Sequence, residues 1–265
     1  MNISIHSDRL DLHVAAWLYI AATQIPGVHV THPDEADLII NVDSIHNSGM
    51  LKGKKTAYYE VDDNLHQGKN VQYYDVDLLY IVTKENLPLY PSHTKVLPVA
   101  MEPTIHYHWP FMETYDMAFI GQADGNDCYA YRRKILDVLT HKFNFLYEDS
   151  RPQNYPKRMS QAKIRVNIMP QFEGKSPLII TRFYESMGIG ATLNDYHSSI
   201  DDIGIVEGKH YIGFTSPEDA IEKGEFYLRN DTSRIEIGNT GRALMLEKHT
   251  WRHRLLKILE DYEKL

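Results

Sequence analysis

Short runs of hydrophobic residues recur along the first hundred positions and alternate with polar segments. Such runs are typical of strands in a parallel sheet, because both faces of the sheet are covered. We expect strands at residues 2–5, 28–31, 36–42, 55–61, 76–82 and 94–97. Hydrophobic residues at helical spacing over residues 10–23 predict a helix that ends at Pro26-Gly27. The pattern therefore predicts an α/β unit with a mostly parallel sheet.

A second unit of the same kind follows a segment at residues 101–115 that is rich in Pro, His and aromatic residues. We interpret that segment as an interdomain linker. Strands are expected at 117–121, 143–147, 164–168, 191–193 and 211–214, and helices at 129–139, 153–162 and 216–226. Ser216 and Pro217 suit the N-cap and first position of the last helix. Residues 232–265 predict a long helical tail broken near Gly238 or Gly241.

The segment SPLIITRFYESMGIGATL, residues 176–193, predicts a further helix and strand. Ser176 is a typical N-cap, and Pro177 suits the first helical position. We expect this helix to end after Met187, at Gly188 and Gly190. Arg182 and Glu185 share one helix face. They could form a surface ion pair, or they could be polar groups at a cleft where helix N–H groups favour a phosphate.

Composition restricts the class of protein. The 265 residues are 43% hydrophobic and 24% charged, as in ordinary globular proteins. The N-terminal sequence does not resemble a signal peptide, and no stretch reaches about 18 uninterrupted apolar residues. With a single cysteine, Cys128, this predicts a cytoplasmic protein without a membrane span. A net charge of −8 argues against a generally basic surface that coats nucleic acid, although a local basic groove is compatible with it.

The second unit opens like a nucleotide-binding βα turn. A hydrophobic strand ends at Gly121, and a polar loop leads to Arg132 and Arg133. Glycine allows a ligand to approach the backbone, but the complete G-x-G-x-x-G motif is absent. Asn167 ends a later strand and is expected near the crevice where ligands bind parallel sheets. Lys163 precedes that strand and would reach the crevice only through a folded-back loop.

Candidate acid/base groups follow the strand at residues 55–61. They are Asp62, Asp63 and His66, which could take a proton from an acceptor hydroxyl. The two aspartates could instead coordinate a divalent ion or form a solvated turn. His249 and His253 are four positions apart and are expected on one helix face, a spacing that can bind metal, but no third ligand is evident, and we expect no metal.

Several segments, in this order, resemble the CgeB-like (spore-maturation type) glycosyltransferases, a branch near glycosyltransferase family 4 with the GT-B fold. These segments are YYEVDDNLH, DLLYIV, KVLPVAMEPTIH, DMAFIG with YRRKIL, AKIRVNI, TRFYESMGIGATL and KHTWRHR. The resemblance covers roughly residues 55–256. It implies an α/β protein with two Rossmann-like domains facing across a cleft and a C-terminal helical tail. We place the acceptor-side domain at residues 1–105, the donor-binding domain at 106–245, and a helix packing back on the first domain at 246–265.

The resemblance also implies roles for individual residues. Glu185 would hydrogen-bond the donor ribose, Arg182 and Lys163 would be cations near the diphosphate, and Gly121 would lie where the backbone approaches the donor. His249, Thr250 and Arg254 match the family's ending. The donor-binding set that we predict is Gly121, Arg132, Lys163, Asn167, Arg182, Glu185, His249 and Arg254. Related enzymes often carry a second glutamate eight positions before the ribose glutamate; here that position is Pro177, and the nearest upstream acid is Glu173. The sugar contact and the stereochemical outcome are therefore unassigned.

The predicted function is transfer of a hexose or pentose from a nucleotide sugar, with a UDP-sugar as the expected donor, to a hydroxyl acceptor. No cofactor is expected besides this co-substrate. The acceptor could be a glycan, a lipid precursor or, in a phage-type enzyme, a hydroxylated base in DNA. The DNA alternative predicts a basic rim at Lys52, Lys54, Lys55 and Lys69. A non-catalytic nucleotide-sugar-binding module and a Rossmann-type methyltransferase are the competing classes.

Overall fold

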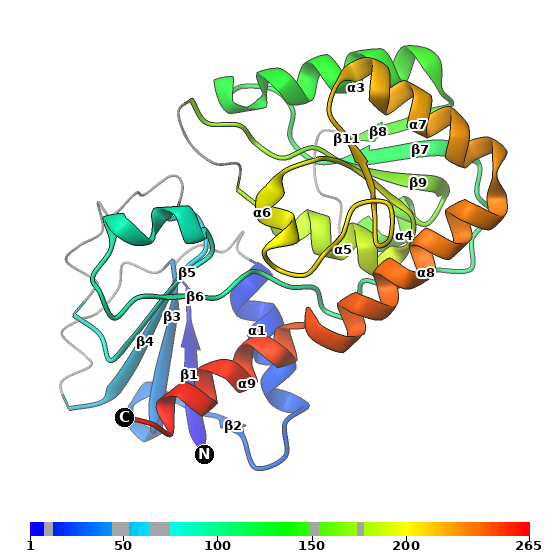
Figure 1. Cartoon of the computed structure of the whole chain (residues 1–265). Helices are drawn as coiled ribbons and strands as arrows, with labels where there is room; N and C mark the ends of the chain where they lie inside the picture. Colours follow the sequence, from blue (N-terminus) through cyan, green and yellow to red (C-terminus); the bar gives the residue numbers. More distant parts are fainter. Residues whose placement is uncertain (8–12, 44–52, 64–74, 149–153, 174–177) are drawn as a thin grey trace. The chain divides into compact units, whose positions relative to one another are not determined.

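The computed structural model describes residues 1–7, 13–43, 53–63, 75–148, 154–173 and 178–265 (Figure 1). The chain divides into two compact units. The first unit comprises Met1–Val99 with Thr250–Leu265, and the second comprises Ala100–His249. The sequence-based boundaries lay at 105/106 and 245/246, a few residues away. Within the described residues, no helix is long and apolar enough to cross a membrane.

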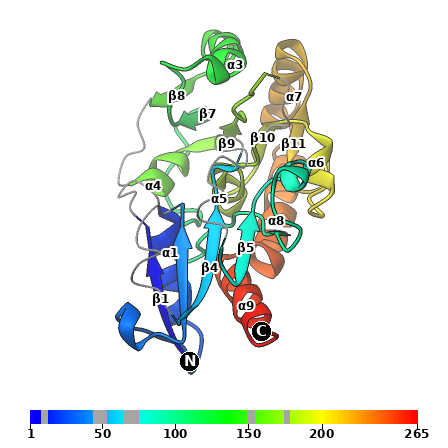
Figure 2. The ribbon, with the colours of Figure 1, turned by 90° about the vertical axis from the view of Figure 1, so that its left-hand side faces the viewer.

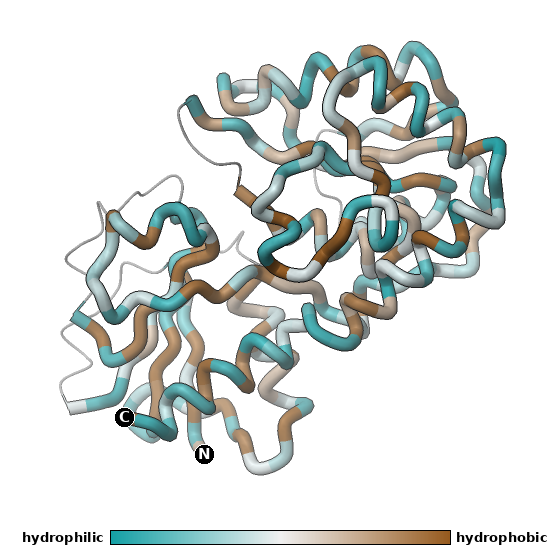
Figure 3. Tube along the Cα trace, viewed as in Figure 1, coloured by the Kyte–Doolittle hydropathy of each residue, from teal (hydrophilic) through white to brown (hydrophobic). Residues whose placement is uncertain are grey.

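The first unit contains a parallel sheet with strand order β2-β1-β3-β4-β5-β6. Figure 2 shows β1, β4 and β5 of this sheet. The strands are β1 (Asn2–His6), β2 (His29–Val30), β3 (Leu38–Val42), β4 (Lys55–Glu60), β5 (Leu78–Ile81) and β6 (Lys95–Val96). All six strands predicted from the hydrophobic pattern are confirmed. Every residue of β3 and β5 is buried, which explains why their sequences are hydrophobic except for Asn41 of β3 and the amphipathic Tyr80 of β5 (Figure 3). Two short 3₁₀ helices, η1 (Pro33–Glu35) and η3 (Lys84–Leu89), follow β2 and β5.

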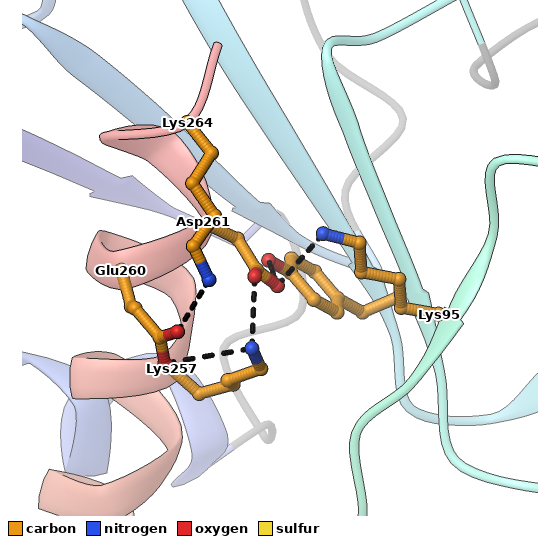
Figure 4. Close-up of polar contacts among 6 residues, drawn as sticks. Lys95, Lys257, Glu260, Asp261 and Lys264 are labelled. Atoms are coloured by element: carbon orange, nitrogen blue, oxygen red, sulfur yellow. Dashed lines mark hydrogen bonds and ion pairs between the residues drawn. The ribbon is translucent and has the colours of Figure 1, made fainter.

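Two helices pack together in the first unit, α1 (His13–Thr23) and the C-terminal α9 (Trp251–Tyr262). Thr250 is the N-cap of α9 and accepts the backbone N–H of His253, whose ring in turn contacts the N-cap backbone. Trp251 is wholly buried, edge-on to Tyr59 of β4. The last turn of α9 is joined to β5 and β6 by Asp261, which contacts Tyr80 and Lys95 (Figure 4).

The second unit contains a parallel sheet with strand order β11-β10-β9-β7-β8. Its strands are β7 (Tyr115–Ile120), β8 (Phe145–Glu148), β9 (Ala162–Asn167), β10 (Thr192–Asp195) and β11 (Ile212–Phe214). Its helices are η4 (Asp127–Tyr129), α3 (Ala130–Lys142), α4 (Tyr155–Met159), α5 (Thr181–Ile189), α6 (Ser198–Asp201), α7 (Pro217–Arg229) and α8 (Asp231–Lys248). The predicted strands are confirmed, and so is Ser216 as the N-cap of α7, accepting the Asp219 N–H at 3.1 Å.

The alternation of side chains along β9 separates two environments. Ile164, Val166 and Ile168 lie in the hydrophobic cluster that includes Ile135 of α3 and Ala220 of α7. Lys163, Arg165 and Asn167 occupy the alternate positions and therefore point to the opposite face of the sheet. That face is covered by α5, which packs on β9. The polar residues of β9 thus face α5.

Two helix boundaries differ from the sequence prediction. Helix α5 begins at Thr181, after Ile180, and ends at Ile189, whereas Ser176 and Pro177 lie outside the described residues. Gly188 lies inside the helix, where a Cβ would meet the His106 carbonyl oxygen at 2.9 Å, whereas Gly190 is the C-cap, as predicted. Gly188 is a packing glycine, and not the end of the helix.

The C-terminal tail breaks at His249–Thr250, and not at Gly238 or Gly241. Those glycines lie within α8, where a Cβ at Gly238 would stand 2.7 Å from the Ala191 backbone nitrogen. Glycine is needed there for close approach of two backbones. The break at 249–250 comes from the N-cap Thr250, a local signal that the glycines obscured.

Candidate functional site

Gly121 and Arg182 meet at the carboxyl end of β7. Gly121 has a φ of +152°, in the region that favours glycine, and a Cβ there would stand 2.5 Å from Arg182 Cζ. The guanidinium also lies over the Phe119 ring, 5.1 Å from its centroid. Two residues 61 positions apart in the sequence thus lie against each other.

Arg132 fixes the loop that follows Gly121. Its side chain is 1% exposed and donates to the Ile168 carbonyl oxygen at 2.9 and 2.7 Å and to that of Gln122 at 2.5 Å. It also stacks on Tyr129, 4.3 Å from the ring centroid. Burial lowers its pKa to about 10, and the neighbouring Arg182 charge adds to that effect. Each nitrogen of the Arg132 guanidinium therefore donates to a backbone carbonyl oxygen, and the side chain holds the loop to the end of β9.

Arg182 differs because its donors are not satisfied. Its Nε and Nη1 atoms are buried and have no hydrogen-bond partner among the described residues. Burial lowers the pKa of its guanidinium, opposed by the phenols of Tyr155 and Tyr129. Buried donors without partners are costly, and an anion would satisfy both.

The N-terminus of α5 adds to this cationic site. Arg182 lies in its first turn, and the N-cap residue Ile180 makes no side-chain cap. The N–H groups of a first helical turn carry partial positive charge and bind phosphates. Helix and guanidinium together therefore form a site suited to a phosphate or diphosphate group.

Polar side chains line the ends of the neighbouring strands. Asn167, at the end of β9, is fully buried and donates to Asn194 Oδ1 at 2.5 Å. At the end of β10, Asp195 accepts the Met169 N–H at 2.9 Å, and its Oδ2 lies 3.0 Å from His197 Nε2. Asp195 and His197 were missed in the sequence, although their place directly after a hydrophobic strand was the available signal.

Glu185 lies one turn after Arg182 on α5, but its environment is different. Its side chain is 0% exposed, and its Oε1 lies 3.4 Å from His106 Nε2. The Glu102 N–H donates to His106 Nδ1 at 3.1 Å, so the Nε2 side of the ring faces the carboxylate. A carboxylate that hydrogen-bonds a donor ribose must be accessible to the donor, whereas the Glu185 side chain is buried in this structure. The role of Glu185 in donor binding stays a prediction.

In the first unit, acidic residues follow β3 and β4. Asp43 has a φ of +43°, unusual for a non-glycine residue, and its Oδ1 accepts the N–H groups of Val61 at 2.7 Å and Asp62 at 3.5 Å. Such strained residues persist where the surroundings hold them, often at functional sites. Asp43 was not a sequence candidate; the structure makes it the residue that positions the Asp62 backbone.

Asp62 and Asp63 have opposite environments. Asp62 is half-buried, whereas Asp63 is 0% exposed and accepts hydrogen bonds from Thr83 N (2.8 Å), Thr83 Oγ1 (2.9 Å) and Asn86 Nδ2 (3.3 Å). Burial raises the pKa of Asp63 to about 6, although these hydrogen bonds act against the rise. Asp63 therefore anchors the start of η3, and Asp62 is the better placed of the two to meet an acceptor. His66 lies outside the described residues.

Three other predicted donor residues lie elsewhere. Lys163 stands near the amino end of β9, with its Nζ 3.8 Å from Asp116 Oδ1, and is not brought to the carboxyl ends of the strands. Arg254 donates to the carbonyl oxygens of Pro98 (2.6 Å) and Val99 (3.1 Å), so it joins α9 to the end of the first unit's main segment. His249 lies 5.6 Å from the Tyr184 ring, centroid to centroid, at the end of α8.

The premise of a histidine pair on one helix was wrong. His249 ends α8, and His253 lies in the first turn of α9 and takes part in its capping box. Among the described residues, no group of three His, Cys, Asp or Glu side chains is arranged to hold a metal ion.

Comparison with solved structures shows the same fold in several proteins. HepE of Anabaena, solved with UDP, is similar over 100% of this chain and 99% of its own, with a TM-score of 0.67 and 10% identity. The T4 phage enzyme BGT, solved with UDP and Mn²⁺, is similar over 97% and 99%, with a TM-score of 0.58 and 14% identity. Sucrose-phosphate synthase of Thermosynechococcus elongatus is similar over 86% and 73%, with a TM-score of 0.58 and 8% identity. With its two parallel Rossmann-like sheets and C-terminal helices, the chain has the GT-B fold.

Sequence comparison identifies the family. No curated protein sequence matches this chain significantly. A family model described as glycosyl transferase-like matches residues 126–260, just over half of the 265 residues. The match includes β9, α5 and α8, and so the elements that carry Asn167 and Arg182. The chain therefore belongs to the glycosyl transferase-like family.

Proposed function

We propose that this protein is a glycosyltransferase that transfers a sugar from a UDP-sugar to a hydroxyl acceptor. The second unit binds the donor, and the first unit supplies the acceptor side. The family match supports the reaction class. The UDP in the solved HepE and BGT structures supports the choice of nucleotide. Within the family, the motifs around Asp62, Arg182 and His249 favour the CgeB-like branch.

One observation carries the donor site: two buried nitrogens of Arg182 have no hydrogen-bond partner in the described part of the chain. Arg182 lies in the first turn of α5, where the N-cap residue makes no side-chain cap. A nucleoside diphosphate leaves with developing negative charge. Fixed donors aimed at that charge are stabilising because they need no reorganisation during the reaction. Arg182 and the N–H groups of α5 are proposed to bind the diphosphate, while Gly121 allows its close approach and Arg132 holds the loop.

The acceptor hydroxyl must lose a proton as it attacks the sugar. Asp62 is proposed as the base if the reaction inverts the anomeric carbon, because it is half-buried and its backbone is held by Asp43. Asp63 already accepts three hydrogen bonds, and it is proposed to shape the loop. His66 stays a further candidate for the base.

A donor-binding experiment tests the proposal. Thermal unfolding is measured with UDP-, GDP-, ADP- and CDP-sugars, since a ligand that binds only the folded state raises the melting temperature. We expect the largest rise with a UDP-sugar. Arg182→Gln should lose most of that rise, whereas Arg229→Gln, which removes an exposed arginine of α7 paired with Glu225, should keep it. Wild-type donor affinity in Arg182→Gln would refute the assigned site.

Turnover separates an enzyme from a binding module. We expect release of UDP from the bound donor above the rate in buffer, increased by the correct acceptor. Retained binding with release no faster than in buffer would instead support a non-catalytic nucleotide-sugar-binding module.

A glycan or lipid-precursor hydroxyl is our first proposal for the acceptor. The alternative of a hydroxylated DNA base draws on the likeness to a β-glucosyltransferase described as a DNA modifying enzyme, at 12% identity. The basic rim predicted for that alternative is not supported by its two described lysines. Lys54 donates to the carbonyl oxygens of Asp34 and Ala36, and Lys55 pairs with Asp77, all at the amino end of β4. Lys52 and Lys69 lie outside the described residues.

A further inference from the structure

A second basic site lies in the same unit, at the other end of the sheet from Arg182. A cavity of about 280 Å³ opens beside the amino end of β9, between the end of α5 and the middle of α8. Its volume is near the lower end of the range for small-molecule pockets. Its charged lining consists of Lys163, Arg165, Arg234, Arg242, His108 and Glu113.

The charge of this lining is unbalanced. Four permanent cations face the cavity, and Glu113 is the single carboxylate among the lining residues. Two carboxylates outside the lining pair with these cations. Asp116 lies 3.8 Å from Lys163 Nζ, and Asp231, which pairs with Arg234 at 2.5 Å, is 72% exposed. The cavity therefore has an excess of positive charge, which attracts an anion.

Arg165 is the buried centre of this site. It is 3% exposed, and its Nη1 and Nη2 contact the Lys163 carbonyl oxygen (3.2 Å) and His108 Nδ1 (3.1 Å). Its Nε is buried and has no hydrogen-bond partner among the described residues. Burial lowers its pKa to about 10, partly opposed by Glu113. An unsatisfied guanidinium donor in a cavity is costly unless a ligand or solvent accepts its hydrogen bond.

The surrounding backbone keeps this guanidinium in place. A Cβ at Gly190 would stand 2.6 Å from Arg165 Nη1, so glycine at the end of α5 makes room for the cation. Arg242 donates to the Gly188 carbonyl oxygen and so fixes α8 to the same helix end. The cavity is thus formed by α5, α8 and β9, with Arg165 and Arg242 among its lining residues. None of the described residues that line it lies at the carboxyl end of a strand.

We propose that this pocket binds a phosphorylated small molecule through its phosphate group, at a site separate from the donor site. Arg165 and Arg234, which are 3% and 6% exposed, would contact the phosphate from the wall of the cavity, and the half-exposed Lys163 would contact it from the rim. Arginine binds phosphate through paired, charge-assisted hydrogen bonds, and lysine acts as a point charge. Because α5 carries Arg182 near its start and Gly190 at its end, a ligand here would occupy the opposite end of the donor-binding helix.

Calorimetry with inorganic pyrophosphate tests this proposal. Pyrophosphate could occupy both basic sites, so the Arg182→Gln variant is titrated first, at fixed ionic strength. One binding event should survive in that variant. Adding Lys163→Gln and Arg234→Gln should weaken the surviving event at least tenfold. Arg229→Gln in the same background should change it less than twofold, because Arg229 does not line the cavity.

The outcomes separate this inference from the proposed function. Loss of all pyrophosphate binding in Arg182→Gln would overturn the second site and leave the donor site intact. Unchanged affinity after Lys163→Gln and Arg234→Gln would also overturn it. If the double substitution lowers the melting temperature of the free protein, Lys163→Gln alone is used. Its ion pair is long and half-exposed, and a threefold or larger loss of affinity is then expected.

Discussion

The phenol of Tyr80 donates a hydrogen bond of 2.9 Å to Asp261 Oδ2, although 181 positions separate the two residues (Figure 4). The same carboxylate lies 3.0 Å from Lys95 Nζ and 2.9 Å from Lys257 Nζ, and its side chain is 3% exposed. Burial acts to raise the pKa of Asp261, but hydrogen bonds from Lys257, Lys95 and Tyr80 outweigh it and lower the pKa to about 2. The pKa of the Tyr80 phenol is raised by burial and by the carboxylate. This cluster fastens the last helix to the first unit.

Asp261→Asn should therefore destabilise the first unit in a pH-dependent way. A carboxyl whose pKa is about 2 when folded and 3.8 when unfolded stabilises the protein above pH 4, and this contribution is lost as the pH falls towards 2. We expect a loss of about 2 kcal/mol in unfolding free energy at pH 7. Urea unfolding followed by tryptophan fluorescence checks this. Glu260→Gln, at an exposed site, is the control, and an equal loss for Asp261→Asn at pH 2 and pH 7 would contradict the mechanism.

Asp63→Asn should change the pH dependence of the unfolding free energy in the opposite direction to Asp261→Asn. The folded pKa of about 6 exceeds the unfolded value of 3.8, so ionisation penalises the folded state as the pH rises from 4 to 6. An asparagine keeps the shape, and its amide can still bond to Thr83 and Asn86. Relative to wild type, the variant should gain stability by up to about 3 kcal/mol between pH 4 and pH 7. Urea unfolding measures the difference in unfolding free energy between variant and wild type. A difference that does not change between pH 4 and pH 7 would contradict a raised pKa of Asp63 in the folded protein.

Asp62→Asn should act on turnover and not on stability. If Asp62 is the base of an inverting reaction, removing its charge should lower kcat by about 10²- to 10⁴-fold with an unchanged Kd for the donor. Initial rates at saturating donor and acceptor measure the first quantity, and calorimetry measures the second. Asp63→Asn is the matched control because it alters the neighbouring carboxyl. Wild-type turnover in Asp62→Asn would exclude the residue from the mechanism.

The strands and their order of appearance could be predicted from the sequence because burial on both faces leaves a mostly hydrophobic run, as in β3 and β5. The N-cap of α7 could be predicted as well, because Ser216 and Pro217 are a local signal. Helix-interior glycines were harder. Whether a glycine ends a helix or admits a neighbour depends on residues far away in sequence, such as Ala191 beside Gly238.

The environments of the candidate donor-binding residues also depend on residues that are distant in the sequence. Arg182 and Glu185 share a helix face, and the sequence alone could not distinguish their environments. Glu185 is covered because His106, 79 positions earlier, lies against it, whereas Arg182 meets the side-chain-free surface of Gly121. Lys163 and Asn167 likewise share a face of β9 but stand towards opposite ends of it. Strand order in the sequence predicted these ends, and the fold shows that, among the described residues, no loop folds back to bring Lys163 to the carboxyl end.

Gly121→Ala tests whether the approach of Arg182 to the backbone matters for donor binding. The added methyl group would stand 2.5 Å from Arg182 Cζ, so the guanidinium must move away from the carboxyl end of β7. We expect at least a tenfold weaker donor affinity, measured by calorimetry with a UDP-sugar.

Gly125→Ala is the matched control. Gly125 also has a positive φ, +90°, but its nearest neighbour to a Cβ is Gln122 Nε2 at 3.8 Å. The Gly125→Ala variant should lose about 1–3 kcal/mol of stability, because alanine is strained at a positive φ, and it should keep its donor affinity.

Since Gly121 acts through Arg182, the double variant Gly121→Ala with Arg182→Gln should bind the donor no more weakly than Arg182→Gln alone. Additive losses would show that Gly121 acts independently of Arg182.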